Sequence, residues 1–557
     1  MKNKVIVIGL DGATFDIIKP LINEGKLPVI ASLLSKGASA ELQSTLPPIS
    51  GPAWTSFLTG MNPGKHGVFH FLTRRSDGNG FLLCSSHDIK TPTIFDYISA
   101  EDKTIGSINI PMTYPPPKVN GFIVSGIPVP PQAKDYTYPY ELYEDIKMHV
   151  GDYTIDYDFS SMNKKVDSIL DEIERYRYLA ENLMDIEERR LKTGLFLMNK
   201  YPCDLFVIVL TLLDRVQHYF WRFMDKRHAG YSDIGAKEFG RVIHNCYEKI
   251  DKAIGEIISS SSDNTTFIVM SDHGSGPHYS DFHINKWFID IGWLQMKSCP
   301  RVILNRSNIK RILTKLGFKK LSEKLPPSLN SLSIFIPKVK RENDFIDIVW
   351  SKTLAYSAFY GISINLKGRE ERGIIEPGEE YQKLIEVLKA RLYQLIDPRT
   401  GEPLIENILE KNEIYSGPFS DQGPDILFLT KDLNCIPSDS YTAHSWYEIR
   451  VNHATSGTHR MNGIFIMKGK GIKNTEELQN LKITDIAPTI LYLLHAPIPK
   501  GMDGRLITEA FTPQFLNENK IKFTDIELGY KKERRSFYSA QEEEMLKESL
   551  KGLGYMS

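Results

Sequence analysis

Short β-branched runs that lead into acidic side chains constrain the fold of this chain more than any other feature. The run at 4–10 passes directly into Asp11, and two later runs precede Asp214 and Asp272 in the same way. Helical patterns lie between the runs, and this alternation predicts an α/β fold with a mostly parallel sheet covered by helices on both faces. The expected strands are 4–10, 104–109, 122–125, 204–210 and 266–270, and the clearest helices are 164–199 and 241–259.

The residues that follow these strands are candidates for a binding site, because ligands of parallel sheets bind beyond the carboxyl ends of the strands. Asp214 and His218 are four apart and therefore share one face of a helical turn. Asp272 and His273 offer a carboxylate and an imidazole from one strand-end turn. His459 stands just before a further apolar run, GIFIM.

These side chains together predict a metal site. A single Asp at a strand end is more often a helix cap or a turn former, and a single His is more often structural, so the argument rests on their combination. Oxygen and nitrogen donors without a thiolate suit two borderline-hard divalent cations. Two such cations can hold the attacking and leaving oxygens of a phosphoryl displacement. The six candidate ligands are Asp11, Asp214, His218, Asp272, His273 and His459.

Ser50 is the candidate nucleophile. It opens the sequence SGPAWTSFL, in which 53–58 is expected to be helical and Pro52 suits the first turn. A hydroxyl at a helix N-terminus faces free N–H groups and the positive end of the helix dipole, where a phosphate also binds. Taken alone, Ser50 is better explained as an N-cap serine, so its role as nucleophile depends on the other candidate residues.

Composition excludes several classes of protein. The 557 residues contain 68 Lys+Arg and 69 Asp+Glu, and this balance gives no general basis for binding nucleic acid or an acidic membrane. Five scattered cysteines without CxxC spacing argue against a disulfide framework and a cysteine zinc site. No apolar run reaches the roughly 18–20 residues of a membrane span, and 1–12 lacks the features of a signal peptide. We expect a soluble, cytoplasmic protein.

The stretch 297–341 interrupts the alternation. It holds twelve Lys and Arg residues against one acid, Glu323. It is either an exposed amphipathic helix of an insertion, a basic lid over an anionic substrate, or a surface that touches anionic lipid.

The domain organisation expected from these patterns is a core interrupted by a cap. Strands are expected within the cap at 355–366 and 425–429, with a helix at 381–395 between them, and another helix at 541–553 in the tail. The boundaries are 1–290 and 440–512 for the core, 291–439 for the inserted cap that sets specificity, and 513–557 for the tail.

The candidate residues recur in an order that resembles a known family. Asp11, the SGPAWTSFLTG block with NPGKHG after it, Asp214-x-x-x-His218, Asp272-His273-Gly274 and Gly457-Thr-His459 are similar to the metal and nucleophile motifs of the alkaline phosphatase superfamily. The closer resemblance is to its type I phosphodiesterase/nucleotide pyrophosphatase branch, and there to the prokaryotic phosphohydrolase/phosphomutase-like group. It covers almost the whole chain, through the further phrases INLKGREERGII (364–375), GPDIL (423–427), DIAPTILYLL (485–494) and LKGLGY (550–555).

The resemblance implies an alkaline-phosphatase-like α/β core with an inserted cap, two divalent metal ions and a phosphorylated small-molecule substrate. The ions would be Zn²⁺, with Mn²⁺ as the alternative, and the reaction would pass through a phosphoserine intermediate on Ser50. The implied ligand sets are Asp214, His218 and His459 for one metal, and Asp11, Asp272 and His273, completed by Ser50, for the other.

At one position that binds substrate in the family, this sequence departs from the pattern of the nucleotide pyrophosphatases. Nucleotide pyrophosphatases place an asparagine shortly after the equivalent of His66 and Gly67 to bind a phosphate oxygen, whereas this chain reads VFHFLTRR. Either His70, Arg74 or Arg75 takes over that contact, or the phosphate is held differently, so a nucleotide substrate does not follow from the resemblance.

Several activities share this core. Phosphodiester or pyrophosphate hydrolysis is the first expectation, and phosphomonoester hydrolysis or a phosphomutase reaction is the second. Phosphonate hydrolysis stays open, as does a metal-binding protein without turnover. Ser50 lies in SGPAW and not in a Cys/Ser-x-Pro-x-Arg context, which argues against a sulfatase.

Overall fold

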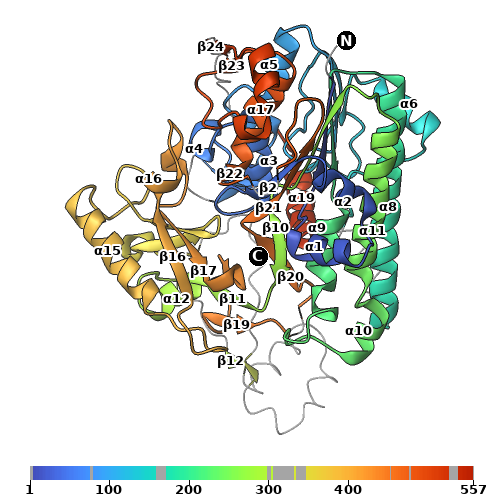
Figure 1. Cartoon of the computed structure of the whole chain (residues 1–557). Helices are drawn as coiled ribbons and strands as arrows, with labels where there is room; N and C mark the ends of the chain where they lie inside the picture. Colours follow the sequence, from blue (N-terminus) through green and yellow to red (C-terminus); the bar gives the residue numbers. More distant parts are fainter. Residues whose placement is uncertain are drawn as a thin grey trace.

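The computed structural model describes residues 4–75, 80–158, 171–297, 347–451, 453–475, 478–525 and 537–555, and the backbone of two short strands, β12 (Ile303–Leu304) and β13 (Leu332–Ser333). A nine-stranded sheet in the order β22-β2-β21-β9-β1-β8-β5-β6-β7 forms its centre (Figure 1). The strands are β1 (Lys4–Leu10), β2 (Ala38–Gln43), β5 (Ile105–Ile108), β6 (Gly121–Val124), β7 (Thr137–Tyr138), β8 (Leu205–Leu210), β9 (Thr265–Met270), β21 (Asn462–Lys468) and β22 (Leu481–Lys482).

The middle of the sheet is parallel. β1 pairs in parallel with β8 on one side and with β9 on the other, and β5 and β6 continue the parallel order. β21 is antiparallel to β9 and β2, and β7 is antiparallel to β6. The near-continuous apolar runs suit strands that are buried on both faces. The predicted mostly parallel α/β sheet is confirmed.

Alternate side chains of β1 enter two separate cores. Val5 and Val7 face one layer of helices, and Ile6 and Ile8 face the other. One layer contains α3 (Ser50–Thr59), α5 (Ile94–Ala100) and α17 (Ile486–Leu493). The opposite layer contains α1 (Phe15–Asn23), α2 (Pro28–Leu34), α8 (Glu172–Lys200), α9 (Leu212–Phe220) and α11 (Val242–Ser259) (Figure 1).

Gly9 lets α3 approach the centre of the sheet. A Cβ at Gly9 of β1 would lie 2.4 Å from a ring carbon of Trp54 on α3, the helix that begins at Ser50. We expect Gly9→Ala to lower the free energy of unfolding by about 1–3 kcal/mol, because the core there has no room for a methyl group. Thermal unfolding measures this. Gly501→Ala is the matched control, because a Cβ there meets nothing within 4 Å; equal losses in both variants would contradict the packing argument.

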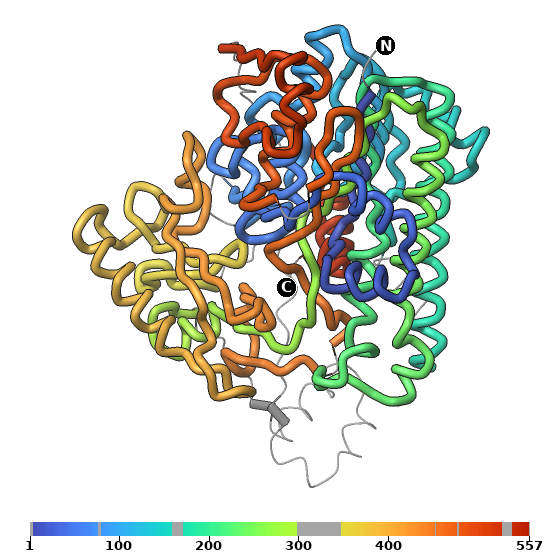
Figure 2. Tube along the Cα trace, in the orientation of Figure 1, coloured from blue at the N-terminus to red at the C-terminus, as the bar shows by residue number. Residues whose placement is uncertain are grey.

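Residues 355–430, which lie between β9 and β21 in the sequence, form a separate lobe (Figure 2). Figure 2 shows this segment, in yellow and orange, gathered on one side of the molecule. Its sheet has the order β14-β15-β17-β16, with a helix beside it. The elements are β14 (Ala355–Ala358), β15 (Gly361–Ile364), α15 (Glu379–Tyr393), β16 (Ile405–Glu410), α16 (Lys411–Ile414) and β17 (Ile426–Thr430).

The single strand expected at 355–366 is wrong. The segment is the hairpin β14–β15, which turns at Phe359 and Tyr360, both with positive φ. A continuous β-like sequence pattern hid this turn, because neither residue is a typical turn former. The basic stretch 297–341 lies outside the described residues, apart from Lys297 and the backbone of β12 and β13. The boundaries of the cap stay a prediction.

Besides the two-stranded sheets formed by β3 (Leu72–Arg74) with β4 (Phe81–Leu83) and by β23 (Ile498–Pro499) with β24 (Phe523–Thr524), two further small sheets and several short elements complete the described chain. The predicted tail helix is α19 (Ala540–Gly552). One small sheet pairs β10 (Gly274–Pro277) with β20 (Gly457–Arg460), and the other orders β18 (Cys435–Ser438), β11 (Ser280–His283) and β19 (Tyr447–Ile449). The remaining elements include α4 (Pro63–His66), α6 (Leu142–His149), α10 (Asp233–Phe239), α12 (Ile284–Asp290) and α18 (Pro513–Glu518).

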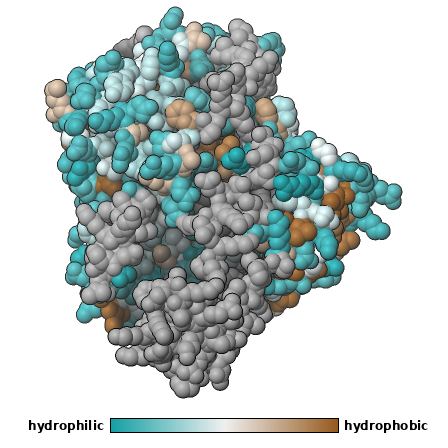
Figure 3. Space-filling model, turned by 180° about the vertical axis from the view of Figure 1, so that it is seen from behind, coloured by the Kyte–Doolittle hydropathy of each residue, from teal (hydrophilic) through white to brown (hydrophobic). Residues whose placement is uncertain are grey.

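Among the described residues, no helix is both long and apolar enough to cross a bilayer. Seen from behind, the coloured surface is mostly hydrophilic, with hydrophobic residues scattered over it (Figure 3). The four cysteines of the described ranges, Cys84, Cys203, Cys246 and Cys435, are buried free thiols.

Candidate active site

Three buried aspartates meet at one edge of the central sheet. Asp11 follows β1, Asp272 follows β9, and Asp214 lies in the first turn of α9, just after β8. Because β9, β1 and β8 are parallel neighbours, their carboxyl ends share this edge. None of the three side chains is more than 1% exposed.

His218 and His459 lie against Asp214. Asp214 Oδ1 is 3.3 Å from Nε2 of each histidine, and the two nitrogens are 3.0 Å apart. Asp214 and His218 share one face of α9, as their spacing predicts. His459 lies just before β21, which contains the apolar run GIFIM. It is part of β20, where it pairs with Ser275 of β10. The short β10–β20 ribbon thus carries His459 over the main sheet.

His273 joins this group to the other two aspartates. Its Nε2 lies 3.5 Å from Asp11 Oδ1 and 3.4 Å from Asp272 Oδ2. Its ring stacks on that of His459, with 3.7 Å between centroids. The potential ligand atoms of His273 are close both to the Asp11–Asp272 pair and to Asp214 and His459. The six predicted side chains therefore form one continuous cluster.

Ser50 lies beside this cluster at the start of α3. Its Oγ is 3.1 Å from His273 Nε2 and 3.4 Å from Asp11 Oδ1, and the residue has no exposed surface. The N-cap position belongs to Ile49, so the hydroxyl of Ser50 is not used to cap the helix. It is directed toward the Asp/His cluster instead.

The histidines are oriented as metal ligands require. A ring nitrogen bonded to a carbonyl must carry its proton there, which leaves Nε2 as the free donor atom. All three rings bond through Nδ1 to backbone carbonyls: His218 to Gly457 at 2.9 Å, His459 to Pro48 at 2.7 Å and His273 to Gly274 at 3.0 Å. All three Nε2 atoms therefore face the cluster.

The carboxylates also fit a cation. One oxygen of each aspartate, Asp11 Oδ2, Asp214 Oδ1 and Asp272 Oδ2, is buried without a hydrogen-bond partner among the described residues. Burial, and then the charge of Asp214, raises the pKa of Asp11 to about 7. Burial and the charge of Asp11 raise the pKa of Asp272 well above its usual range. Positive charge between these groups would relieve this repulsion, so the donor set fits divalent metal ions.

The predicted substrate-binding residues lie where the core meets the insertion. Arg74 donates to Glu370 Oε1 and to Ser363 Oγ, each at 2.6 Å. His70 stacks on Phe359, with 5.5 Å between ring centroids, and the backbone N–H of Arg75 donates to the carbonyl of Gly80. Contact of His70, Arg74 or Arg75 with a phosphate stays a prediction.

Two residues at Ser50 were not predicted from the sequence. The Tyr555 hydroxyl lies 3.0 Å from Ser50 Oγ, and Arg215 Nη1 lies 3.0 Å from that hydroxyl. For Tyr555, the only signal in the sequence was the resemblance of the phrase LKGLGY to the family. Tyr555 is more than 500 residues from Ser50 along the chain, so the sequence did not indicate that the two side chains are in contact. For Arg215, the signal in the sequence is its position directly after the predicted ligand Asp214.

A cavity of about 510 Å³ opens beside His218 and His459. Tyr555 and Arg450 also line it. Its apolar wall is formed by residues from both the core and the insertion: Leu46, Ile49, Leu427, Phe428, Leu433 and Ile436. The space is large enough for an organic group of moderate size.

Comparison with known proteins assigns the chain to a family. The model of a family described as type I phosphodiesterase/nucleotide pyrophosphatase matches residues 5–462. The chain belongs to this family. The match includes all six cluster residues and Ser50, whereas Tyr555 lies beyond it. This phosphodiesterase family consists of phosphoester hydrolases, and the chain is an enzyme of that class.

A solved structure with a TM-score above 0.5 shares the fold of this phosphodiesterase family member. Phosphonoacetate hydrolase from Sinorhizobium meliloti 1021, in complex with phosphonoformate, has a TM-score of 0.51 at 13% identity, covering 89% of this chain and 96% of that one. Human ectonucleotide pyrophosphatase/phosphodiesterase 5 has a TM-score of 0.48 at 12% identity, covering 93% and 99%. No curated protein matches the sequence.

Proposed function

We propose that this protein is a metal-dependent phosphodiesterase in which Ser50 is the nucleophile. The observation that carries the proposal is the position of Ser50 Oγ at the N-terminus of α3, 3.1 Å from His273 and 3.4 Å from Asp11. This places a hydroxyl directly beside a cluster of three carboxylates and three imidazoles. Such a donor set fits two divalent cations, with Zn²⁺ favoured by the histidines.

The bound cations would supply Lewis-acid charge to the phosphoryl oxygens and favour the alkoxide form of a coordinated serine. The side chains Asp214, His218 and His459 would hold one, and Asp11, Asp272 and His273 would hold the other, next to Ser50.

The residues of the chain divide the reaction into two displacements. Ser50 Oγ forms a bond to phosphorus while the bond from phosphorus to the leaving oxygen breaks, which gives a phosphoseryl intermediate. Free N–H groups and the dipole at the start of α3 stabilise the negative charge of the phosphoryl oxygens. Water then attacks phosphorus from the opposite side and restores the Ser50 hydroxyl.

The adjoining cavity favours a diester over a monoester. A diester carries a second organic group, and the apolar wall formed by residues such as Leu427 and Phe428 suits such a group. Among the described lining residues, only Arg450 and Lys551 carry a permanent positive charge, and Arg450 donates to Asp281 Oδ2 at 2.6 Å. A monoesterase or phosphomutase with the same core is the second candidate, and the intact nucleophile and cluster support it equally.

A paired assay tests this choice. Metal-replete protein should hydrolyse bis-p-nitrophenyl phosphate with a kcat/KM at least about tenfold above that for p-nitrophenyl phosphate, which corresponds to roughly 1.4 kcal/mol of transition-state preference. Separate reconstitution with Zn²⁺ and Mn²⁺ identifies the metal that supports turnover. A preference for the monoester would favour the phosphatase or mutase, and phosphosugars would then be tested next.

A further inference from the structure

A segment from the far end of the sequence completes the surroundings of Ser50. The helix α19 packs through Leu546 and Leu550, and the chain continues through Leu553 to Tyr555; these four residues are at most 4% exposed. The segment is therefore built into the core and is not laid loosely over its surface.

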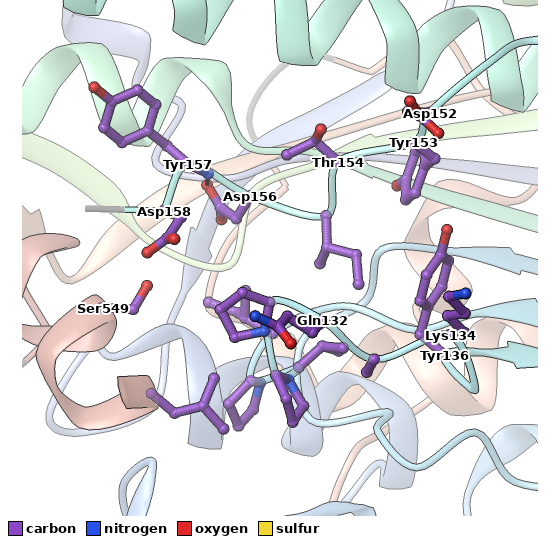
Figure 4. Close-up of a pocket in the computed structure, with 18 of the residues that line it drawn as sticks. Gln132, Lys134, Tyr136, Asp152, Tyr153, Thr154, Asp156, Tyr157, Asp158 and Ser549 are labelled. Carbon is purple, nitrogen blue, oxygen red and sulfur yellow. Dashed lines mark hydrogen bonds between the residues drawn. The ribbon is translucent and has the colours of Figure 1, made fainter. Parts of the chain in front are cut away.

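Polar contacts hold α19 against β4 on one side, and a cavity borders it on the other. Glu543 accepts from the backbone N–H of Leu83 at 2.9 Å, and Lys547 donates to the carbonyl of Phe81 at 3.0 Å. On the other side, α19 borders a cavity of about 490 Å³, across which Ser549 lies near Asp156 and Asp158 (Figure 4). This cavity is separate from the one beside His459.

Tyr555 is held firmly against the nucleophile. Its ring packs on Phe71, with 4.8 Å between centroids, and the guanidinium of Arg215 lies 5.2 Å from the ring centroid. Arg215 is itself fixed by Asp156, at 2.7 and 3.2 Å, and by Asp214. The Tyr555 hydroxyl thus has a defined position 3.0 Å from Ser50 Oγ.

The direction of the hydrogen bonds follows from the chemistry of these groups. A guanidinium can only donate, so the oxygen of Tyr555 accepts from Arg215. The proton of Tyr555 is then available for Ser50 Oγ, while Ser50 can direct its own proton to His273 Nε2 or Asp11 Oδ1. In this network Tyr555 donates and Ser50 accepts.

Gly554 lets the chain come this close. Its φ is +89°, and a Cβ there would lie 3.0 Å from the ring of His218. A larger residue would push either the backbone of Tyr555 or the His218 ring from its place.

We propose that Tyr555 is a catalytic residue that donates a hydrogen bond to Ser50 Oγ, the oxygen that attacks phosphorus and later leaves it. This oxygen carries negative charge as the attacking alkoxide of the first displacement, and negative charge develops on it again when it leaves phosphorus in the second. A positioned donor stabilises both forms without reorganisation. Tyr555 keeps its proton throughout. The proposal rests on the proposed function, because it needs Ser50 to be the nucleophile.

Tyr555→Phe tests the proposal, since it removes the hydroxyl and keeps the packing on Phe71. We expect kcat for the diester to fall by roughly 10²-fold, the effect of losing one preorganised donor, with KM changed less than about threefold and metal content unchanged. Tyr538→Phe is the matched control. It removes another buried tyrosine hydroxyl, just before α19, which donates to the Pro128 carbonyl at 2.9 Å and not to Ser50. Its kcat should stay within about twofold of the parent value.

The outcomes separate the two proposals. If the parent enzyme forms phosphoserine at Ser50 and Tyr555→Phe keeps full kcat, the role of Tyr555 is refuted and the proposed function stands. A rise in kcat in Tyr555→Phe would also refute it, and would identify the segment as a plug that blocks the nucleophile. If the parent enzyme shows no Ser50-dependent turnover, the proposed function itself fails. Thermal unfolding of both variants separates a loss of folding from a loss of chemistry.

Discussion

Ser50→Ala should lower the turnover of the best diester by at least about 10³-fold while the protein keeps its metal ions. The six donors of the cluster stay in place in this variant, because the alanine removes only the Oγ that lies beside Asp11 and His273. The phosphoseryl intermediate should disappear as well. Steady-state kinetics, metal analysis and mass spectrometry of acid-quenched enzyme measure the three effects.

Ser56→Ala is the matched control for this variant. Ser56 lies on the same helix and is equally buried, but its Oγ bonds to His66 Nε2 at 2.9 Å. It should keep turnover within a few-fold of the parent enzyme. Undiminished turnover in Ser50→Ala, or an equal loss in both variants, would refute the role of Ser50 as the nucleophile.

Asp272→Asn should remove bound metal and activity together. Asp272 is fully buried, its Oδ2 has no hydrogen-bond partner among the described residues, and it lies 3.4 Å from His273 Nε2. An amide is a poorer ligand and carries no charge to balance a cation. We expect the metal content after dialysis to fall below half of the parent value, and turnover to fall at least about 10²-fold.

Asp281→Asn is the control for the loss of a buried carboxylate. Asp281 lies outside the cluster and is bonded to His278 Nε2 at 2.9 Å and to Arg450 at 2.6 Å. Its loss should lower the stability, because Arg450 loses its carboxylate partner and keeps its bonds to Thr455, but it should leave the metal content unchanged. A parental metal content in Asp272→Asn would contradict the ligand assignment.

Much of the sheet follows from sequence because its strands are buried on both faces. The runs predicted at 4–10 and 266–270 are β1 and β9 to within one residue. A short continuous apolar run that ends in polar residues is typical of a strand buried on both faces, so its bounds can be predicted closely. The hairpin at Phe359 and Tyr360 was missed, because its turn uses residues that give no turn signal. The helix predicted at 241–259 was confirmed as α11.

The candidate site could be predicted where its residues lie within a few positions of a strand end or of each other. The spacing of four between Asp214 and His218 predicted that they share one face of a helix. The position of Asp272 just after an apolar run predicted that it lies at the end of a strand. The contact between Tyr555 and Ser50 joins distant parts of the chain, so neither periodicity nor spacing could reveal it. The pairing of β20 with β10, which places His459 in a separate ribbon, likewise joins distant parts of the chain.

The central position of β1 has a consequence for how the protein folds during synthesis. Both neighbours of β1 come much later in the sequence, because β8 begins at Leu205 and β9 at Thr265. At about 5–20 residues per second, the ribosome needs roughly 10 to 40 seconds to make the chain between β1 and β8. During that time an apolar strand has both edges unpaired, which is the condition under which nascent chains aggregate or recruit chaperones. The strand that leads into Asp11 is thus made long before either of its partners.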